Sequence, residues 1–140
     1  MKIAVITDSS ANLGTEYIDK IKNLEIIPLM ITIDSNQYRD QLEIDNGAVF
    51  NNLDKLKIKT TVPALQDFRE AVRRFINEKY TDILVITISS KLSSTYNTFK
   101  KASKEFDEIN VHMYDSKTLS MALGNWVEEA VQSVQSNYSI

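Results

Sequence analysis

The sequence predicts a single α/β domain over residues 1–140, an open and mostly parallel sheet with helices on both faces in three layers. Short apolar runs such as residues 3–7 and 83–88 are nearly continuous, which is typical of strands covered on both faces. Between these runs, apolar residues recur at helical spacing. The two kinds of segment alternate, which favours parallel strands joined by right-handed crossovers.

The strands follow in order. Residues 3–7 (IAVIT) predict the first strand, because they are rich in β-branched residues. Residues 25–33 (EIIPLMITI) predict one or two more, with an edge or a bend at Pro28, because proline cannot donate a ladder hydrogen bond. Residues 83–88 (ILVITI) predict the most buried strand, and residues 109–114 (INVHMY) a weaker one.

Helices are predicted between and after the strands. A short helix is expected after Gly14, another over about residues 45–56, and the clearest one after Pro63, which should lie in its first turn. That clearest helix has arginines opposite an apolar face made of Leu65, Phe68, Ala71, Val72, Phe75 and Ile76. Further helices are expected after Ser93 and around Val127.

Composition limits the function classes. Apolar residues make up 43% of the chain and charged residues 25%, with a net charge of −3, which is typical of a globular protein and argues against nucleic acid as a partner. The absence of cysteine excludes disulfides and thiol chemistry. The three glycines form no dinucleotide or P-loop motif. The opening MKIAVITDSS is too short and polar for a signal peptide or a membrane span, so a cytoplasmic location is expected.

Hydroxyl and acidic side chains gather in four segments: DSSANL, SSKLSST and DSKTLS follow predicted strands, and KTTVPAL precedes the arginine-rich helix. Ligands of open α/β sheets bind beyond the carboxyl ends of the strands, where these segments should meet. Residues 60–63 and 90–95 are also expected to open helices, whose N-termini attract anions. Such an edge could hold a carboxylate or a phosphate without lysine or arginine.

Ordinary helix capping is the competing interpretation. Ser, Thr and Asp are the preferred N-cap residues, so capping explains any one of these segments. The segment ISSKLSSTYN at residues 88–97 carries five hydroxyls before Tyr96, which is more than one cap requires. The residues therefore favour a ligand site and leave its ligand open.

Enzyme and metal hypotheses have weaker support. A nucleophilic Ser90 or Ser93 needs a nearby base, yet the only histidine, His112, lies inside a predicted strand, and the G-x-S-x-G motif is absent. A serine hydrolase is therefore the least favoured function. Asp8, Asp40 and Asp115 could offer oxygen ligands to Mg²⁺, but turn and capping roles explain them better. We expect no catalytic residue, metal or cofactor.

Four motifs carry a resemblance to a known family: ITDSSANL at residues 6–13, TTVP at 60–63, SKLSSTY at 90–96 and DSKTLSMALG at 115–124. In their order and spacing they resemble the N-terminal half of the DegV family, bacterial fatty-acid-binding proteins. The resemblance covers nearly all of the chain.

The resemblance implies a lipid carrier or a remnant of one, not an enzyme. It implies a long-chain fatty acid in a tunnel, with its carboxylate held by hydroxyls and presented to a fatty acid kinase. The implied head-group residues are Thr60 or Thr61 and Ser93, with Ser94 and Thr95 as neighbours. The same edge would be lined by Ser9, Ser10, Ser90, Asp115 and Ser116.

The sequence also departs from the family pattern. Ser94 replaces a glycine, which predicts either a strained loop or a narrower pocket. Val62 replaces a polar residue. Family members are about twice as long, and their second domain, which supplies tunnel wall and a histidine, is expected to be absent here. Lipid binding should then be weak unless a second chain completes the tunnel. The alternative is a truncated interaction module that dimerises through the uncovered face and holds no lipid.

Overall fold

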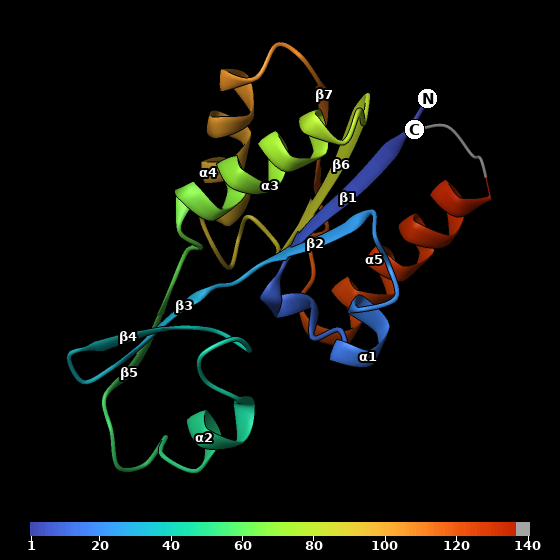
Figure 1. Cartoon of the computed structure of the whole chain (residues 1–140). Helices are drawn as coiled ribbons and strands as arrows, with labels where there is room; N and C mark the ends of the chain where they lie inside the picture. The colour runs from blue at the N-terminus through green and yellow to red at the C-terminus, as the bar shows by residue number, and fades with distance from the viewer. Residues whose placement is uncertain (137–140) are drawn as a thin grey trace.

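The computed structural model describes residues 1–136 and contains a four-stranded parallel sheet, sheet A (Figure 1). Its strand order is β2-β1-β6-β7. The strands are β1 (Ile3–Asp8), β2 (Leu24–Ile27), β6 (Asp82–Thr87) and β7 (Asn110–Asp115). Every residue of β1 is buried, and so is every residue of β6 except the half-buried Leu84. The prediction of a mostly parallel sheet is confirmed.

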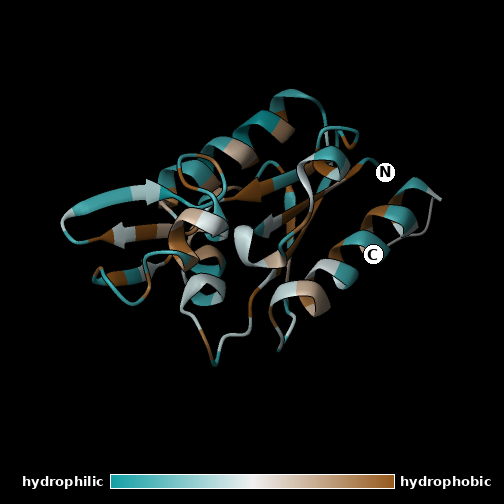
Figure 2. Cartoon of the chain, turned by 90° about the horizontal axis from the view of Figure 1, so that it is seen from below, coloured by the Kyte–Doolittle hydropathy of each residue, from teal (hydrophilic) through white to brown (hydrophobic). Residues whose placement is uncertain are grey.

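Helices cover both faces of sheet A (Figure 1). One face carries α3 (Leu65–Asn77) and α4 (Thr95–Ala102), the latter followed by the short η2 (Ser103–Glu105). The other carries α1 (Thr15–Ile18) and α5 (Ser120–Gln135). Figure 2 shows hydrophobic colour concentrated on the central strands. Among residues 1–136, every helix is too short or too polar to serve as a membrane span.

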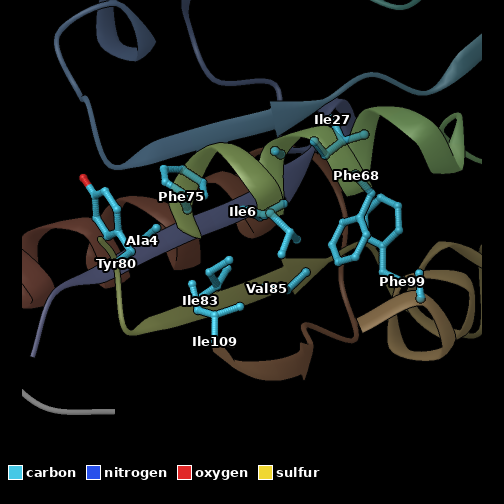
Figure 3. Packing of buried hydrophobic residues seen from close by; sticks show 13 residues of the cluster. Ala4, Ile6, Ile27, Phe68, Phe75, Tyr80, Ile83, Val85, Phe99 and Ile109 are labelled. Atoms are coloured by element: carbon cyan, nitrogen blue, oxygen red, sulfur yellow. The ribbon is translucent and has the colours of Figure 1, made fainter. Parts of the chain in front are cut away.

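The two faces have separate hydrophobic cores, because side chains alternate along each strand. Beneath α3 and α4, Ile6 and Val85 pack against Phe68 and Phe99, whose rings stack with centroids 4.3 Å apart (Figure 3). On the opposite face, strand residues pack against α5 in a second cluster that includes Val5, Ile86, Leu123 and Val127. The expected three layers are therefore present.

A second, antiparallel sheet, sheet B, extends away from sheet A (Figure 1). Its order is β4-β3-β5, from β3 (Met30–Ile33), β4 (Asn36–Arg39) and β5 (Ile58–Thr61), and α2 (Asn46–Phe50) lies between β4 and β5 in the sequence. The bend at Pro28 is confirmed, since it lies between β2 at the edge of sheet A and β3. The sequence did not predict β4 and β5, because NQYR and IKTT are largely polar and become strands only by pairing with β3.

Two helix predictions were wrong in extent. Residues 60–63 do not open a helix, because Thr60 and Thr61 belong to β5 and α3 begins only at Leu65. Pro63 favours extended backbone at the residue before it, so the helix starts after the proline. The helix expected over 45–56 is only α2. Asp45 caps it by accepting a hydrogen bond from the Ala48 amide at 2.8 Å.

Candidate functional site

The carboxyl edge of sheet A brings three of the four polar segments together. They follow β1, β6 and β7, and direct hydrogen bonds join them. Asp8 Oδ2 accepts from the Ile88 amide at 2.8 Å, and Asp115 Oδ1 accepts from the Ser90 amide at 3.0 Å. The two aspartates, one from each strand next to β6, therefore hold between them the loop over residues 88–94, here called the serine-rich loop.

The serine-rich loop is anchored at three consecutive residues. Besides Ile88 and Ser90, the Ser89 amide donates to the Thr118 carbonyl at 2.9 Å. The Ser90 hydroxyl also donates to Asp115 Oδ2 at 2.5 Å. Hydrogen bonds from Ser90 lower the pKa of the Asp115 carboxyl, because they favour its charged form. The side chains of Ser90 and Asp115 thus satisfy each other.

Asp8 is a fully buried carboxylate at the end of β1. Burial raises the pKa of Asp8, while hydrogen bonds from Ser10 and the Ile88 amide lower it and the charge of nearby Asp40 adds to the rise. Both the amide and the hydroxyl of Ser10 donate to Asp8 Oδ1. Asp8 therefore caps the short η1 helix (Ser9–Ala11), to which Ser10 belongs.

The Ser9 hydroxyl, unlike that of Ser10, bonds residues next to sheet B. Its hydroxyl donates to Asp40 Oδ2 at 2.6 Å and accepts from the Leu29 amide at 3.0 Å. Ser116 makes a local turn, because its hydroxyl oxygen accepts from the Thr118 amide at 3.2 Å. Among the expected site residues, Ser9, Ser10, Ser90 and Ser116 each have their hydroxyl bonded within the protein.

Four of the other expected residues, Thr60, Thr61, Ser93 and Ser94, meet at a pocket of about 440 Å³ between the two sheets. That volume lies within the usual range of ligand pockets. Its lining is Leu29, Thr60, Thr61, Val62, Ile88, Leu92, Ser93 and Ser94. The lining joins four hydroxyl residues to four apolar ones and includes no lysine or arginine. Thr60 and Thr61 come from β5, and Ser93 and Ser94 from the loop before α4.

Strand geometry separates the two threonines. Thr60 lies opposite Ile31 and Thr61 opposite Met30 in the β3–β5 pair, so their side chains project from opposite faces of sheet B. Val62 lies two residues beyond Thr60 and also lines the pocket. The alternation therefore assigns Thr60 to the pocket side, and Thr61 contributes from its other face or through its backbone.

Ser93 has a hydroxyl proton available for a ligand. Its oxygen accepts from the Thr95 amide at 3.2 Å and lies 2.9 Å from Thr95 Oγ1. Thr95 is fully buried. When the Thr95 hydroxyl donates to Ser93, both of these bonds use Ser93 as an acceptor, and its own proton points to another partner. The two bonds with Thr95 thus fix the orientation of the Ser93 hydroxyl.

Ser94 occupies the N-cap of α4 without a side-chain capping bond. Its φ is −80°, which any residue adopts, so the expectation of a strained loop is wrong. Its exposed side chain lines the pocket, in keeping with the expected narrowing. The apolar lining residues Leu29, Ile88 and Leu92 were not predicted as site residues. The one sequence signal for an apolar lining was Leu92, which lies among serines. The structure leaves its side chain 60% exposed.

Catalytic and metal chemistry find no support at this edge. His112 Nε2 lies 3.0 Å from Asp82 Oδ1, at the first residue of β6 and thus toward the opposite end of the sheet from Ser93. That contact gives His112 a structural role. Within residues 1–136, no three acidic or histidine side chains gather as a metal site would require.

Gly124 allows α5 to approach η1 closely. A Cβ atom at this position would lie 2.6 Å from the Ala11 carbonyl oxygen. Only glycine fits such a contact without movement of the backbone. The glycine of the last motif therefore supports the loop that carries Ser9 and Ser10.

Comparisons with known proteins agree with the fold. A model of the DegV family matches residues 2–140. A DegV domain-containing protein of Clostridium acetobutylicum is 33% identical over 138 residues, which is 99% of this chain and 49% of the relative. One from Staphylococcus aureus is 34% identical over 139 residues, with the same coverage. The chain spans about half the length of the curated relatives it matches.

Solved structures give the same result. A DegV family protein from Thermus thermophilus, described as fatty acid binding, superposes with a TM-score of 0.89 at 27% identity, over 100% of this chain and 50% of that one. A lipid-binding DegV protein from Thermotoga maritima superposes with a TM-score of 0.84 at 29% identity, over the same shares.

Proposed function

This chain belongs to the DegV family, and from the family and the pocket together we propose that it binds a long-chain fatty acid. The hydroxyls of Thr60 and Ser93 donate to the carboxylate. The observation that carries the proposal is their convergence, from two separate sheets, on one pocket that four apolar residues also line. The non-enzymatic role expected from the sequence accords with relatives described as fatty acid binding.

Hydrogen-bond donors compensate the carboxylate charge in this proposal. Ser93 and Thr60 each offer a hydroxyl proton, and α4 begins at the same loop, so its positive N-terminal end faces the anion. Leu29, Val62 and Leu92 contact the methylenes next to the head group. Thr61 and Ser94 also line the pocket, and the remaining expected residues hold these groups in place without contacting the ligand.

The acyl tail needs more cover than this pocket offers. Each buried methylene contributes about 0.8 kcal/mol, so tight binding requires that most of the tail be enclosed. The relatives have about twice the length of this chain. We therefore propose that a second domain or a second chain covers the tail. Presentation to a fatty acid kinase and a cytoplasmic location stay predictions.

The alternative is an interaction module without lipid. Five exposed apolar side chains near β7, α5 and the serine-rich loop favour it: Leu92, Tyr114, Leu119, Met121 and Trp126. A homodimer through an exposed apolar face, the alternative that the sequence left open, would bury such side chains. Sedimentation of the purified chain distinguishes the two, because a dimer that carries no lipid supports the module and a lipid-loaded particle supports the carrier.

Co-purified lipid tests the proposal directly. The chain is purified, extracted with organic solvent and examined by mass spectrometry for fatty acids. We expect a long-chain fatty acid in the extract, and less of it from a Thr60→Ala/Ser93→Ala double variant purified in the same way. An extract free of acyl species, together with no uptake of added stearate, would refute the carrier function.

A further inference from the structure

We propose that Ser9 and Asp40 are positioning residues that set the distance between Thr60 and Ser93. They form a buried junction between the two sheets and do not contact the lipid. This inference rests on the proposed function, because it explains how the two halves of the carboxylate site are held in register. It gives the hydroxyl of Ser9 a role other than ligand binding.

The two halves of the pocket belong to parts of the fold that pack sparsely against each other. Thr60 is carried by sheet B, and Ser93 by a loop of sheet A. The closely packed element pairs lie within one sheet or between sheet A and its helices, and none joins a strand of sheet B to sheet A. Within the described chain, covalent connections between the sheets run through residues 28–29 and 62–64. Polar contacts therefore help to fix the position of sheet B relative to sheet A.

Ser9 provides those contacts. Its hydroxyl donates to Asp40 Oδ2 and accepts from the Leu29 amide, and its carbonyl accepts from Gln41 Nε2 at 2.8 Å. All three partners flank sheet B, Leu29 directly before β3 and Asp40 and Gln41 directly after β4. Ser9 is 2% exposed and Asp40 is 9% exposed, so water competes little for these bonds.

The junction connects to the pocket on both sides. On the sheet B side, Leu29 lines the pocket, and its carbonyl accepts from the Asp40 amide at 2.9 Å. Two residues further along, Ile31 pairs with Thr60. On the sheet A side, Asp8 precedes Ser9 and accepts from the amide of Ile88, which also lines the pocket. Displacement of the junction therefore changes the spacing of Thr60 and Ser93.

A second polar link is weaker. Arg39 of β4 donates two hydrogen bonds to Asp67 of α3, each at 3.2 Å. The Arg39 side chain is 44% exposed, and exposed ion pairs contribute little to stability. Loss of the Ser9 junction should therefore let sheet B move relative to sheet A, even while this ion pair remains.

The test compares four variants of the chain with stearate as the probe. Ser9→Ala and Asp40→Ala remove the junction, and each should weaken stearate binding roughly tenfold, the equivalent of one lost buried hydrogen bond. Asp40→Asn keeps an oxygen acceptor for Ser9 and should restore most of the affinity. Thr7→Val removes a buried hydroxyl of β1 that has no hydrogen-bond partner among residues 1–136, and should leave the affinity unchanged.

Amide hydrogen exchange gives a readout that does not need the lipid. In Ser9→Ala, the Leu29 amide and the β3–β5 amides should exchange faster, while β1 and β6 stay protected. Asp40→Asn should exchange like the unmodified chain. If the amide exchange rates of sheet B are unchanged in Ser9→Ala, or rise equally in both sheets, the proposed positioning role of the junction is wrong. If the unmodified chain takes up no stearate, the carrier function fails, and the exchange pattern still decides the junction.

Discussion

Thr7 is the residue with the clearest local misfit. Its hydroxyl oxygen is, among residues 1–136, the buried side-chain polar atom without a hydrogen-bond partner. Valine has nearly the same shape and lacks the hydroxyl, so Thr7→Val should raise the free energy of unfolding by about 1 kcal/mol. Urea unfolding measures it. A loss of stability would show that the hydroxyl has a partner in solution.

Ser94 gives a second prediction at the residue scale. With φ at −80°, glycine would relieve no strain here and would add freedom to the unfolded chain. Ser94→Gly should therefore lower the free energy of unfolding by about 0.5–1 kcal/mol and widen the pocket. Thermal unfolding tests the first effect. A more stable variant would contradict the geometry of this loop.

The serine-rich loop shows how far single residues could be predicted. The sequence correctly predicted that its hydroxyls gather at the edge of the sheet. It could not distinguish Ser90 from Ser93, because the difference lies in their partners. Asp115, 25 residues away in the chain, accepts the hydroxyl proton of Ser90, while Ser93 keeps its own proton for a ligand when Thr95 is the donor of their shared bond. Such choices depend on packing between distant segments.

At the scale of elements, the contact between α5 and η1 depends on Gly124. Alanine would gain about 1 kcal/mol of helix propensity but would press its Cβ against the Ala11 carbonyl. Overpacking of this kind costs about 1–3 kcal/mol, so Gly124→Ala should be net destabilising by up to about 2 kcal/mol. The exposed neighbour Asn125→Ala is the control and should be neutral or slightly stabilising. Equal stability in both variants would show that α5 does not lie this close.

The bond between the loop and β7 predicts a dependence on pH. Because Ser90 lowers the pKa of Asp115 in the folded state, the contribution is full above the ordinary carboxyl pKa, about 3.9, and is lost as the pH falls through the folded value. Ser90→Ala should therefore destabilise the chain at neutral pH, and the difference from the unmodified chain should shrink below about pH 4. Urea unfolding across the pH range measures both. A difference that stays constant into strong acid would contradict the charge-dependent bond.

The two sheets differ in how well sequence predicted them. Sheet A was predictable because its central strands, β1 and β6, are buried on both faces and therefore almost continuously apolar. In sheet B, β4 and β5 are mostly exposed and polar, and their pairing with β3 alone makes them strands. This difference also moved Thr60 from an expected helix start to a strand.

At the scale of the whole molecule, the candidate site lies between two separate sheets. Sheet A and its helices hold Ser93, sheet B holds Thr60, and a small buried junction lies between them. Spacing between the two hydroxyls is then a property of the whole chain. The relatives, at about twice this length, have further chain with which to enclose an acyl tail.

Stearate affinity, compared with that of stearyl alcohol, tests the central claim most directly. Titration is carried out on the unmodified chain, on Thr60→Ala, on Ser93→Ala and on the double variant. We predict that the chain prefers stearate, that each single change removes most of this preference, and that the double variant loses less than the sum, because both hydroxyls share one carboxylate. Equal affinity for acid and alcohol, or stearate binding that neither substitution alters, would contradict a carboxylate held between Thr60 and Ser93.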